Sequence, residues 1–558
     1  MGKEVLAMYD VRGIQNYIFR TNKVREIIGA SELIENIFNK GFQYAIEKEE
    51  KKDAFRLNWE AEDKNAELTF IEDESILMQV LFIGGGNAYA VFRDESVCQR
   101  INRRMSRYIL DKTYSLQLAI ATVSTELKDY LKDYERLQRE MAKVKAQMLP
   151  AHPYPAIPIV AVDEMTGFPI SKKGYSLDKN ADDKTELVSR ENYEKRKASK
   201  KIGEDSGVEK IFDNMVTEKG KDSILAIVHI DGNNLGGRIK AIVESGQQGE
   251  SYQDSVNRVR KLSSNIKKSF SDTFEKMEKC LSDWTAKDSF PLSDKKYIKD
   301  EKEKKIKKYI RKIIVAGDDI TFVCNASMAL ELVQFFLKDI SQKVMFGDAD
   351  NANDLARYGL SACAGIAYVN SHFPFSEGYK MAEECCESAK KRAKDEANKV
   401  ALASGEKIIG NWVDFHICKH ISTNDLEYHR KKDFKLADGG YLLRRPYYVM
   451  YENAQAEKVA ELQEVNKINA DYDIAGLFSD IDYFNGAGKE DFPKSFSKNL
   501  RNIYPLGQVE LDKYVAFIES RCKTLPGGQQ PFDEKQIAKW YDALEMMDLY
   551  MKVSMEVE

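Results

Sequence analysis

Two adjacent aspartates lie on a predicted turn between two apolar segments of the sequence. The stretch "RKIIVAGDDITFVCN", residues 311–325, has apolar runs on both sides of Asp318 and Asp319. Adjacent carboxylates repel one another, and burying either without a partner is costly. Such a turn is expected either as an exposed, Asp-rich turn or as a site where divalent cations offset the repulsion. The turn alone supports both interpretations about equally.

A third carboxylate is predicted to reach the same turn. The segment "SILAIVHID", residues 223–231, has the pattern of a strand that ends on Asp231. In a β-α-β-β-α-β sheet the first strand lies beside the hairpin, so we expect Asp231 to face the turn. With the carbonyl oxygen of Gly232, these carboxylates would form a site suited to Mg²⁺ or Mn²⁺. Two such ions would activate a hydroxyl nucleophile and neutralise a triphosphate.

Residues near these carboxylates could contact a nucleotide. Gly232 and Gly317 leave room for phosphate oxygens to approach backbone N–H groups. Lys390, in "ESAKKRAKD", lies on a predicted helix and could reach a triphosphate, although a solvated helix face explains this lysine equally well. The sequence has no G-x-x-x-x-G-K-[ST] motif, which excludes the P-loop mode of nucleotide binding.

The elements that must position these residues occur twice along the chain. Both copies have the order β-α-β-β-α-β, which is ferredoxin-like, with an added C-terminal helix. The first copy comprises a strand at 4–10, a helical region from residue 14, a hairpin at 75–92, a helix at 94–112, a strand at 117–125 and a helix at 126–148. The second comprises a strand at 223–231, a helical region, a hairpin at 312–325, a helix at 327–341, a strand at 360–369 and a helix at 376–397.

The two predicted hairpins differ in their acidic residues. When "IGGGNAYAV" is laid over "VAGDDITFV", Gly86 and Asn87 fall where Asp318 and Asp319 stand. One copy therefore keeps an acidic turn that the other has lost. We interpret the pattern as a duplication in which only the second copy is active.

Bulk properties restrict the class of protein. The chain of 558 residues is too long for a single core. Its net charge of −5 gives no global basic field for nucleic acid, so such binding would need local patches. The eight cysteines form no C-x-x-C pair, which argues against a thiolate zinc site. No apolar run reaches the length of about 18 residues that a membrane span needs, and we expect a cytoplasmic protein with no membrane contact.

We predict an α+β fold with four regions. They are a first palm-like domain at 1–150, a linker region with surface helix and no zinc cysteines at 151–221, a second palm domain at 222–404 and a helical C-terminal domain at 405–558. The charge run at 294–312 is expected to form a solvated helical insertion rather than a basic contact to RNA.

A set of motifs adds a family resemblance. The stretches "YDVRGIQNYIF", "IGASELI", "FIGGGNAYAVF", "HIDGNNLGG", "VAGDDITFV" and "SACAGIAYVNSHFPFSEGYKMAEECCESAK" follow one another in this order. Together they resemble the large polymerase/cyclase-like subunit of type III CRISPR–Cas effector complexes. The resemblance covers both ferredoxin-like copies, and the helical tail is compatible with it.

The resemblance implies a specific activity and partners. In that family the second palm condenses ATP into cyclic oligoadenylates when the complex, with its guide RNA, binds target RNA; some relatives are thought to join AMP to S-adenosylmethionine. It implies that Asp231, Asp318 and Asp319 hold two Mg²⁺ or Mn²⁺ ions. It also implies nucleotide contacts for a further set of residues, namely Ser31, Gly232, Asn234, Gly317 and Lys390.

Several positions depart from the family pattern. Ala316 replaces the first glycine of the G-G-D-D turn, and Asn233 stands where an aspartate is common, so one metal ligand could be neutral. The cysteine-rich zinc element between the palms is replaced by "VAVDEMTGFP" at 160–169. The first palm strand begins almost at Met1, so we expect no HD nuclease domain and no nuclease activity on DNA.

Three functions compete on this sequence. The leading one is a metal-dependent nucleotidyltransferase that makes a signalling nucleotide. A catalytically weak scaffold subunit of the ribonucleoprotein is the first alternative, because Asn233 suggests a second palm that has drifted. A stand-alone GGDEF-like nucleotide cyclase is disfavoured, because the first palm is fused in the same chain and has lost its acidic turn.

Overall fold

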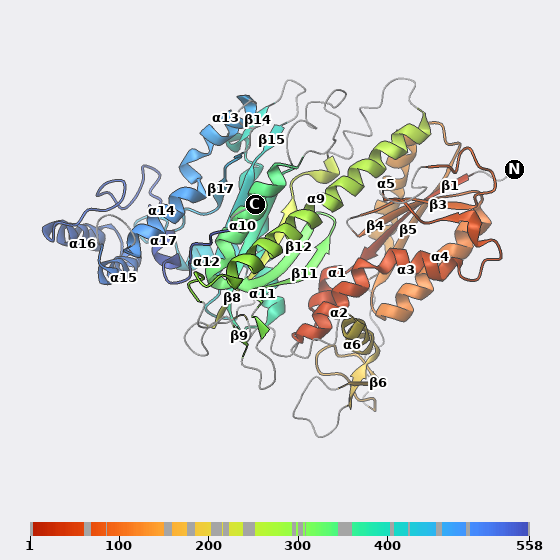
Figure 1. Ribbon diagram of the computed structural model, residues 1–558, viewed down its shortest axis with the longest axis horizontal. Helices are drawn as coiled ribbons and strands as arrows, with labels where there is room; N and C mark the ends of the chain where they lie inside the picture. The colour runs from red at the N-terminus through yellow and green to blue at the C-terminus, as the bar shows by residue number, and fades with distance from the viewer. Residues whose placement is uncertain are drawn as a thin grey trace. The chain divides into compact units, whose positions relative to one another are not determined.

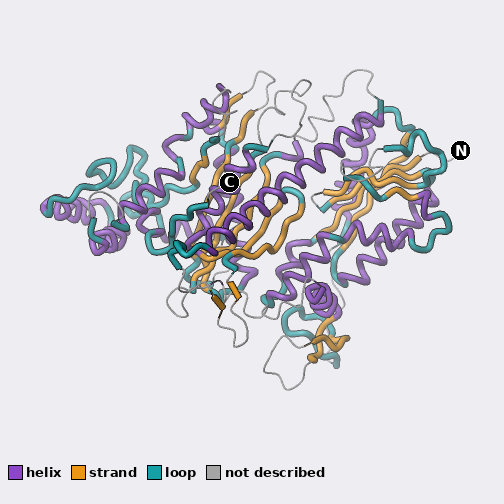
Figure 2. The backbone as a smooth tube through the Cα atoms, viewed as in Figure 1, coloured by secondary structure: helices purple, strands orange, loops and turns teal. Residues whose placement is uncertain are grey.

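The computed structural model describes sixteen parts of the chain, and its strands gather in two main sheets (Figure 1; Figure 2). The described residues are 4–60, 68–84, 86–149, 159–175, 185–201, 215, 223–237, 251–292, 297–298, 305–306, 308–343, 360–401, 407–421, 425–452, 460–486 and 492–555.

The chain divides into two compact units. Unit 1 comprises Met1–Ile211, Asn234–Ser271 and Ile313–Ile320. Unit 2 comprises Phe212–Asn233, Asp272–Lys312 and Thr321–Glu558. The tip of the acidic hairpin therefore belongs to unit 1, whereas Asp231 belongs to unit 2.

The sheet of unit 1 has the strand order β2-β3-β4-β1-β5. Strand β1 lies antiparallel to both β4 and β5, and β4 lies antiparallel to β3. Four of its strands thus follow the ferredoxin-like order, as predicted. The strands are β1 (Glu4–Arg12), β2 (Phe55–Arg56), β3 (Met78–Gly84), β4 (Asn87–Phe92) and β5 (Gln117–Thr125).

Two helices of unit 1 begin at aspartates that cap them. Asp94 accepts a hydrogen bond from the backbone N–H of Val97, and Asp129 accepts one from that of Lys132. Each aspartate satisfies a donor that the first turn leaves without a partner. The helices are α1 (Ile14–Phe19), α2 (Val24–Glu35), α3 (Ile37–Ile46), α4 (Glu95–Thr113) and α5 (Tyr130–Gln147).

The segment after the first palm is more than a linker with a surface helix. Strands β6 (Ile170–Tyr175) and β7 (Thr185–Ser189) pair with each other, and helix α6 (Arg190–Lys201) follows them. Helix α6 packs on α2 (Figure 1). The side chains of Glu191, Lys195 and Arg196 on α6 are buried. The expectation of a surface helix is corrected here, because buried ion pairs compensate the charges of this helix.

The second sheet has the order β11-β12-β8-β13-β16-β17. Its first four members repeat the order of the first sheet, which supports the duplication. Strand β16 then adds in parallel to β13, so the sheet continues past residue 404, where we expected a helical domain to begin. The strands are β8 (Ile224–Gly232), β11 (Ile310–Ala316), β12 (Asp319–Asn325), β13 (Ala362–Asn370), β16 (Asn411–Ile417) and β17 (Tyr447–Val449).

The charge run at 294–312 does not form the expected helical insertion where the structure describes it. Strands β9 (Tyr297–Ile298) and β10 (Lys305–Ile306) pair in a two-stranded antiparallel ladder, and β11 begins at Ile310. The β-branched and aromatic residues among the lysines favour strands. A second small ladder joins β14 (Lys399–Ala401) to β15 (Lys407–Ile409).

Helices predominate after β17, as predicted for the C-terminal region. None of the helices in the described parts of the chain is long and apolar enough to cross a membrane. The helices of the second half are α9 (Tyr252–Ala286), α10 (Ala329–Ser341), α11 (Phe375–Ala393), α12 (Leu426–Asp433), α13 (Ala460–Ile468), α14 (Ile474–Phe484), α15 (Lys494–Ile503), α16 (Gln508–Ser520) and α17 (Tyr541–Met546).

Helix α11 lies close against β13 because the strand is built from small residues. A Cβ atom added at Gly365 would lie 2.0 Å from the carbonyl oxygen of Ala382 and 2.3 Å from the backbone nitrogen of Cys386. These distances are far inside van der Waals contact. Glycine at this position therefore sets the separation between the sheet and the helix that carries Lys390.

We predict that Gly365→Ala lowers the free energy of unfolding of unit 2 by about 1–3 kcal/mol, because the added methyl group overpacks the contact between β13 and α11. Urea denaturation followed by circular dichroism measures the change. Gly476→Ala is the matched control: no atom lies within 4 Å of its added Cβ, and it should be neutral or slightly stabilising on helix α14. Equal midpoints for the two variants would contradict this packing analysis.

Candidate active site

The carboxylate of Asp231 forms an ion pair with the ammonium of Lys390. Asp231 is the last residue but one of β8 and lies opposite Cys363 of β13, while Lys390 lies in the last turn of α11. Lys390 Nζ donates a hydrogen bond to Asp231 Oδ2. Burial lowers the pKa of Lys390, but the charge and hydrogen bond of Asp231 outweigh it, so the pKa lies above its ordinary value. Two residues that the sequence predicted separately are thus brought together.

The first palm contains a matching ion pair that the sequence reasoning missed. Asp10, near the end of β1, accepts a hydrogen bond of 2.6 Å from Lys145 Nζ in the last turn of α5. In both palms, therefore, a carboxylate at the end of the first strand binds a lysine of the closing helix. Laying the helix of Lys390 over the first copy would have revealed Lys145.

The two hairpins start their second strands at equivalent positions. Two residues separate β3 from β4, and two separate β11 from β12. Asn87 opens β4 and lies opposite Asp10 in the β1–β4 register, while Asp319 opens β12. Gly317 has φ 69°, a left-handed conformation that favours glycine and that here begins the acidic turn.

Asp318 and Asp319 line a small cavity together with Ser31. The cavity has a volume of about 80 Å³, and all of its lining residues belong to unit 1. Helices α1 and α2 supply most of the wall, including the side chains of Gln15 and Glu35. Ser31 is nearly buried, with 8% of its surface exposed. A space of this size holds an ion, a water or part of a phosphate, but not a whole nucleotide.

The side chain of Asn233 has a structural role that the sequence did not suggest. It is buried, and its Nδ2 donates to the carbonyl oxygen of Gly410 at 3.1 Å and to Ser361 Oγ at 3.3 Å. Its backbone N–H donates to the carbonyl oxygen of Ser361. These bonds join the end of β8 to the starts of β13 and β16. The amide of Asn233 therefore stabilises the arrangement of these three strands.

The remaining predicted contacts lie at the end of β8. Gly232 ends the strand opposite Ala362 and is buried. Asn234 has φ 52° and is exposed, and a Cβ added at Gly237 would lie 2.5 Å from its Oδ1. The side chain of Asn234 therefore lies close to Gly237, three residues further along the chain.

The metal-binding prediction remains untested by these contacts. Among the residues that the structure describes, no three His, Cys, Asp or Glu side chains form a group that could hold a metal ion. Asp231 belongs to one unit and the acidic turn to the other. The three-carboxylate cluster is therefore a prediction from the sequence and from the strand order.

Two solved structures are similar to this chain along most of its length. The chain resembles crystal structures of a Csm1–Csm4 cassette in complex with cA4 (12% identity, 98% of this chain and 70% of the other, TM-score 0.48) and of Csm1 in T. onnurineus (12% identity, 99% and 70%, TM-score 0.45). No curated protein matches the chain. These values are too low to carry an argument about function.

A family model gives a firmer result for part of the chain. Residues 224–402 match the family described as Cas10/Cmr2, second palm domain. This segment contains Asp231, the acidic turn and Lys390, so the resemblance stated from the sequence motifs is confirmed there. Over residues 224–402 the chain is similar to a Cas10/Cmr2 second palm domain.

Proposed function

We propose that this protein is a metal-dependent nucleotidyltransferase that condenses ATP into a signalling nucleotide. The product would be a cyclic oligoadenylate, or AMP joined to S-adenosylmethionine. The observation that carries the proposal is the acidic turn of Asp318 and Asp319, which opens on a cavity shared with Ser31 and lies in a Cas10/Cmr2 palm segment.

The donor set fits a magnesium site. Asp231, Asp318, Asp319 and the carbonyl oxygen of Gly232 are the hard oxygen ligands that Mg²⁺ prefers. The Asp10–Asn87 register in the first palm supports the placement, because the duplication predicts that Asp231 lies opposite Asp319. When bound, the ions would activate the attacking hydroxyl and neutralise the leaving pyrophosphate.

Residues of the chain would do the rest by binding and orientation. The ammonium of Lys390, which now neutralises Asp231, would bind the triphosphate instead. Ser31 would donate a hydrogen bond to the nucleotide, and the backbone at Gly232, Asn234 and Gly317 would allow phosphate to approach. Catalysis of phosphoryl transfer needs little more than such positioning and charge stabilisation.

The partners follow from the family resemblance. We infer that the chain acts in a type III CRISPR antiviral effector complex, with other subunits and a guide RNA, and that target RNA activates it. ATP is the proposed substrate, and S-adenosylmethionine is the alternative acceptor for AMP. Mass spectrometry of the product made with and without S-adenosylmethionine identifies the second substrate.

A non-catalytic scaffold is the second candidate function. The observation in its favour is that Lys390 already binds the carboxylate of Asp231, while the Asn233 amide is used by the sheet. A stand-alone GGDEF-like cyclase is the third, and offering GTP alone tests it. Incubation of the complex with ATP, Mn²⁺ and target RNA separates the first two, because a scaffold forms no phosphodiester product.

We predict that Asp318→Ala with Asp319→Ala lowers product formation from ATP by at least about a hundredfold, because the double change removes charge that a metal-bound transition state needs. Separation of radiolabelled products measures the rate. Circular dichroism should show an intact fold, since Asp318 lies on the turn and Asp319 is the first residue of β12. Product formation within about twofold of the wild type would show that the assigned turn is not the catalytic one.

We predict that Lys390→Met raises the KM for ATP by about ten- to a hundredfold, because a charge-assisted contact to the triphosphate is lost. Lys391→Met is the matched control, since Lys391 is exposed on the same helix. Steady-state kinetics over a range of ATP concentrations provides the KM. Identical KM values for the two variants would assign Lys390 to the Asp231 ion pair alone.

A further inference from the structure

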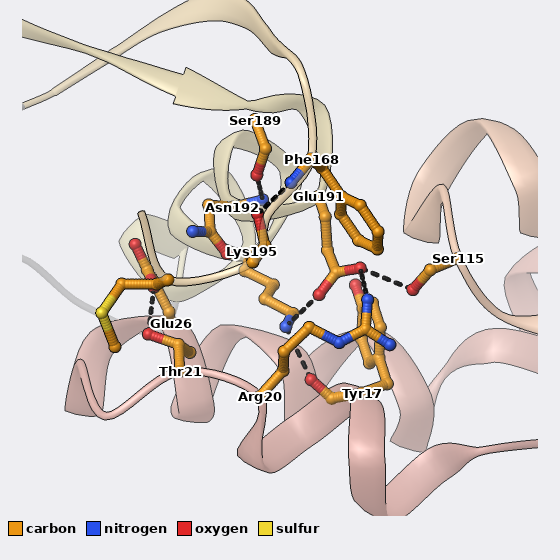
Figure 3. Close-up of polar contacts among 12 residues, drawn as sticks. Tyr17, Arg20, Thr21, Glu26, Ser115, Phe168, Ser189, Glu191, Asn192 and Lys195 are labelled. Atoms are coloured by element: carbon orange, nitrogen blue, oxygen red, sulfur yellow. Dashed lines mark hydrogen bonds and ion pairs between the residues drawn. The ribbon is translucent and has the colours of Figure 1, made fainter. Parts of the chain in front are cut away.

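Helix α6 carries a group of charged side chains that are fully buried. Glu191 and Lys195 are 0% exposed, and Arg196 is 1% exposed. The face of α6 that holds them packs on α2 of the first palm. Figure 3 shows the side chains of Glu191 and Lys195 pointing from the helix toward Tyr17 and Arg20. Charges are almost never buried so completely unless they are paired.

Lys195 and Glu191 tie α6 to the end of α1. Lys195 Nζ donates to the carbonyl oxygen of Tyr17 at 2.6 Å and to Glu191 Oε1 at 2.7 Å (Figure 3). Glu191 Oε2 accepts hydrogen bonds from Arg20 at 3.0 Å and from Ser115 Oγ at 2.5 Å. Burial lowers the pKa of Lys195, and the charge of Glu191 offsets part of this effect. The Glu191 carboxylate thus links α6 to the end of α1 and to the residues that precede β5.

A second ion pair ties α6 to the start of α2. Arg196 donates to Glu26 Oε1 at 2.7 Å, and Thr21 Oγ1 donates to Glu26 Oε2 at 2.5 Å. Two carboxylates and two cations are therefore buried together, and their charges balance. Removing Glu191 would leave the Lys195 ammonium buried without its ion-pair partner, which is strongly destabilising.

Close backbone contact fixes the distance between α2 and α6. A Cβ atom added at Gly29 would lie 1.7 Å from the carbonyl oxygen of Lys195. No larger residue fits there without separation of the helices. The ion pairs set the lateral position of α6 on α2, and Gly29 sets the distance between the two helices.

Asp163 binds the N-terminal end of α6 through hydrogen bonds. Its carboxylate accepts hydrogen bonds from the backbone N–H groups of Met165, Thr166 and Ser189, and from the side chain of Asn192. Burial opposes the ionisation of Asp163, but these hydrogen bonds outweigh it and hold its pKa below the ordinary value. No cysteine lies between residues 150 and 222, so a thiolate zinc site does not fit this segment.

The helices held by this network also line the candidate cavity. Ile14, Gln15 and Ile18 of α1 lie on its wall, and Ser31 and Glu35 of α2 lie there too. Tyr17 and Ser31 therefore belong to helices that contact both the cavity and the network of Lys195 and its partners. A shift of about 1 Å in such elements is enough to impair a reaction that depends on positioning.

We propose that Lys195 and Glu191 are positioning residues, which hold α1 and α2 so that Ser31 faces the acidic turn in the geometry that nucleotide binding requires. The inference rests on the proposed function. The segment between the palms would then contribute to substrate affinity. Its buried ion pairs would do so at the place where the family resemblance leads us to expect a zinc element.

The test compares Lys195→Met with Lys197→Met, which changes an exposed lysine of the same helix. Hydrogen exchange of the full chain should be at least about tenfold faster at residues 14–35 in Lys195→Met and unchanged in Lys197→Met. The Kd for a non-hydrolysable ATP analogue, measured by calorimetry, should rise about tenfold only in Lys195→Met. Where Lys195→Met fails to fold, Arg20→Met, which removes a half-exposed partner of Glu191, should give a smaller change of the same kind.

The outcomes are distinguishable. Unchanged exchange at residues 14–35 overturns the inference, whatever the wild type does with nucleotide. Faster exchange with unchanged Kd also overturns it, because the network is then structural only. A wild type that binds no ATP analogue refutes the proposed function and with it the role in affinity, while the exchange result still reports whether the network holds the helices.

Discussion

A carboxylate at the end of a central strand requires a cation, and this requirement links the sheet to its closing helix in both palms. Asp231 binds Lys390 in the second palm, and Asp10 binds Lys145 in the first. In each case the lysine lies in the last turn of its helix, where the helix dipole also favours a positive charge. The ion pair thus fixes the end of the helix on the sheet at the position where catalysis is proposed. In the second palm the small residues of β13, Gly365 above all, let that helix come close enough.

The duplication explains how one architecture supports two roles. The strand order and the ion pair are features that both palms share. The acidic turn is the feature in which they differ, since Asn87 opens β4 where Asp319 opens β12. Ser31 of α2 lines the cavity beside the acidic turn, and α6 packs on α2 with buried ion pairs. We therefore propose that the second palm supplies the charged side chains and that the first palm supplies part of the nucleotide-binding surface.

Sequence reasoning worked where local patterns determine structure and missed what distant partners determine. Apolar periodicity predicted the strands and helices of both palms, because each has a buried face that its own residues display. It did not predict β16 beside β13, since strand pairing across intervening residues leaves no local signal. It assigned α6 to the surface because Glu191 and Lys195 are charged, and their partners, Tyr17 and Arg20, lie far away in the chain. The candidate site residues followed from motifs, whereas the structural role of Asn233 required the fold.

The most direct test of the central claim is a crystal structure of the protein with Mn²⁺ and a non-hydrolysable ATP analogue, with the metal located by anomalous scattering. The account predicts metal within about 2.0–2.6 Å of carboxylate oxygens from Asp231 and from the turn of Asp318 and Asp319. It also predicts that the Lys390 ammonium has left Asp231 for a phosphate oxygen. A structure with the nucleotide bound, Asp231 still paired with Lys390 and no metal on its carboxylate would contradict the account.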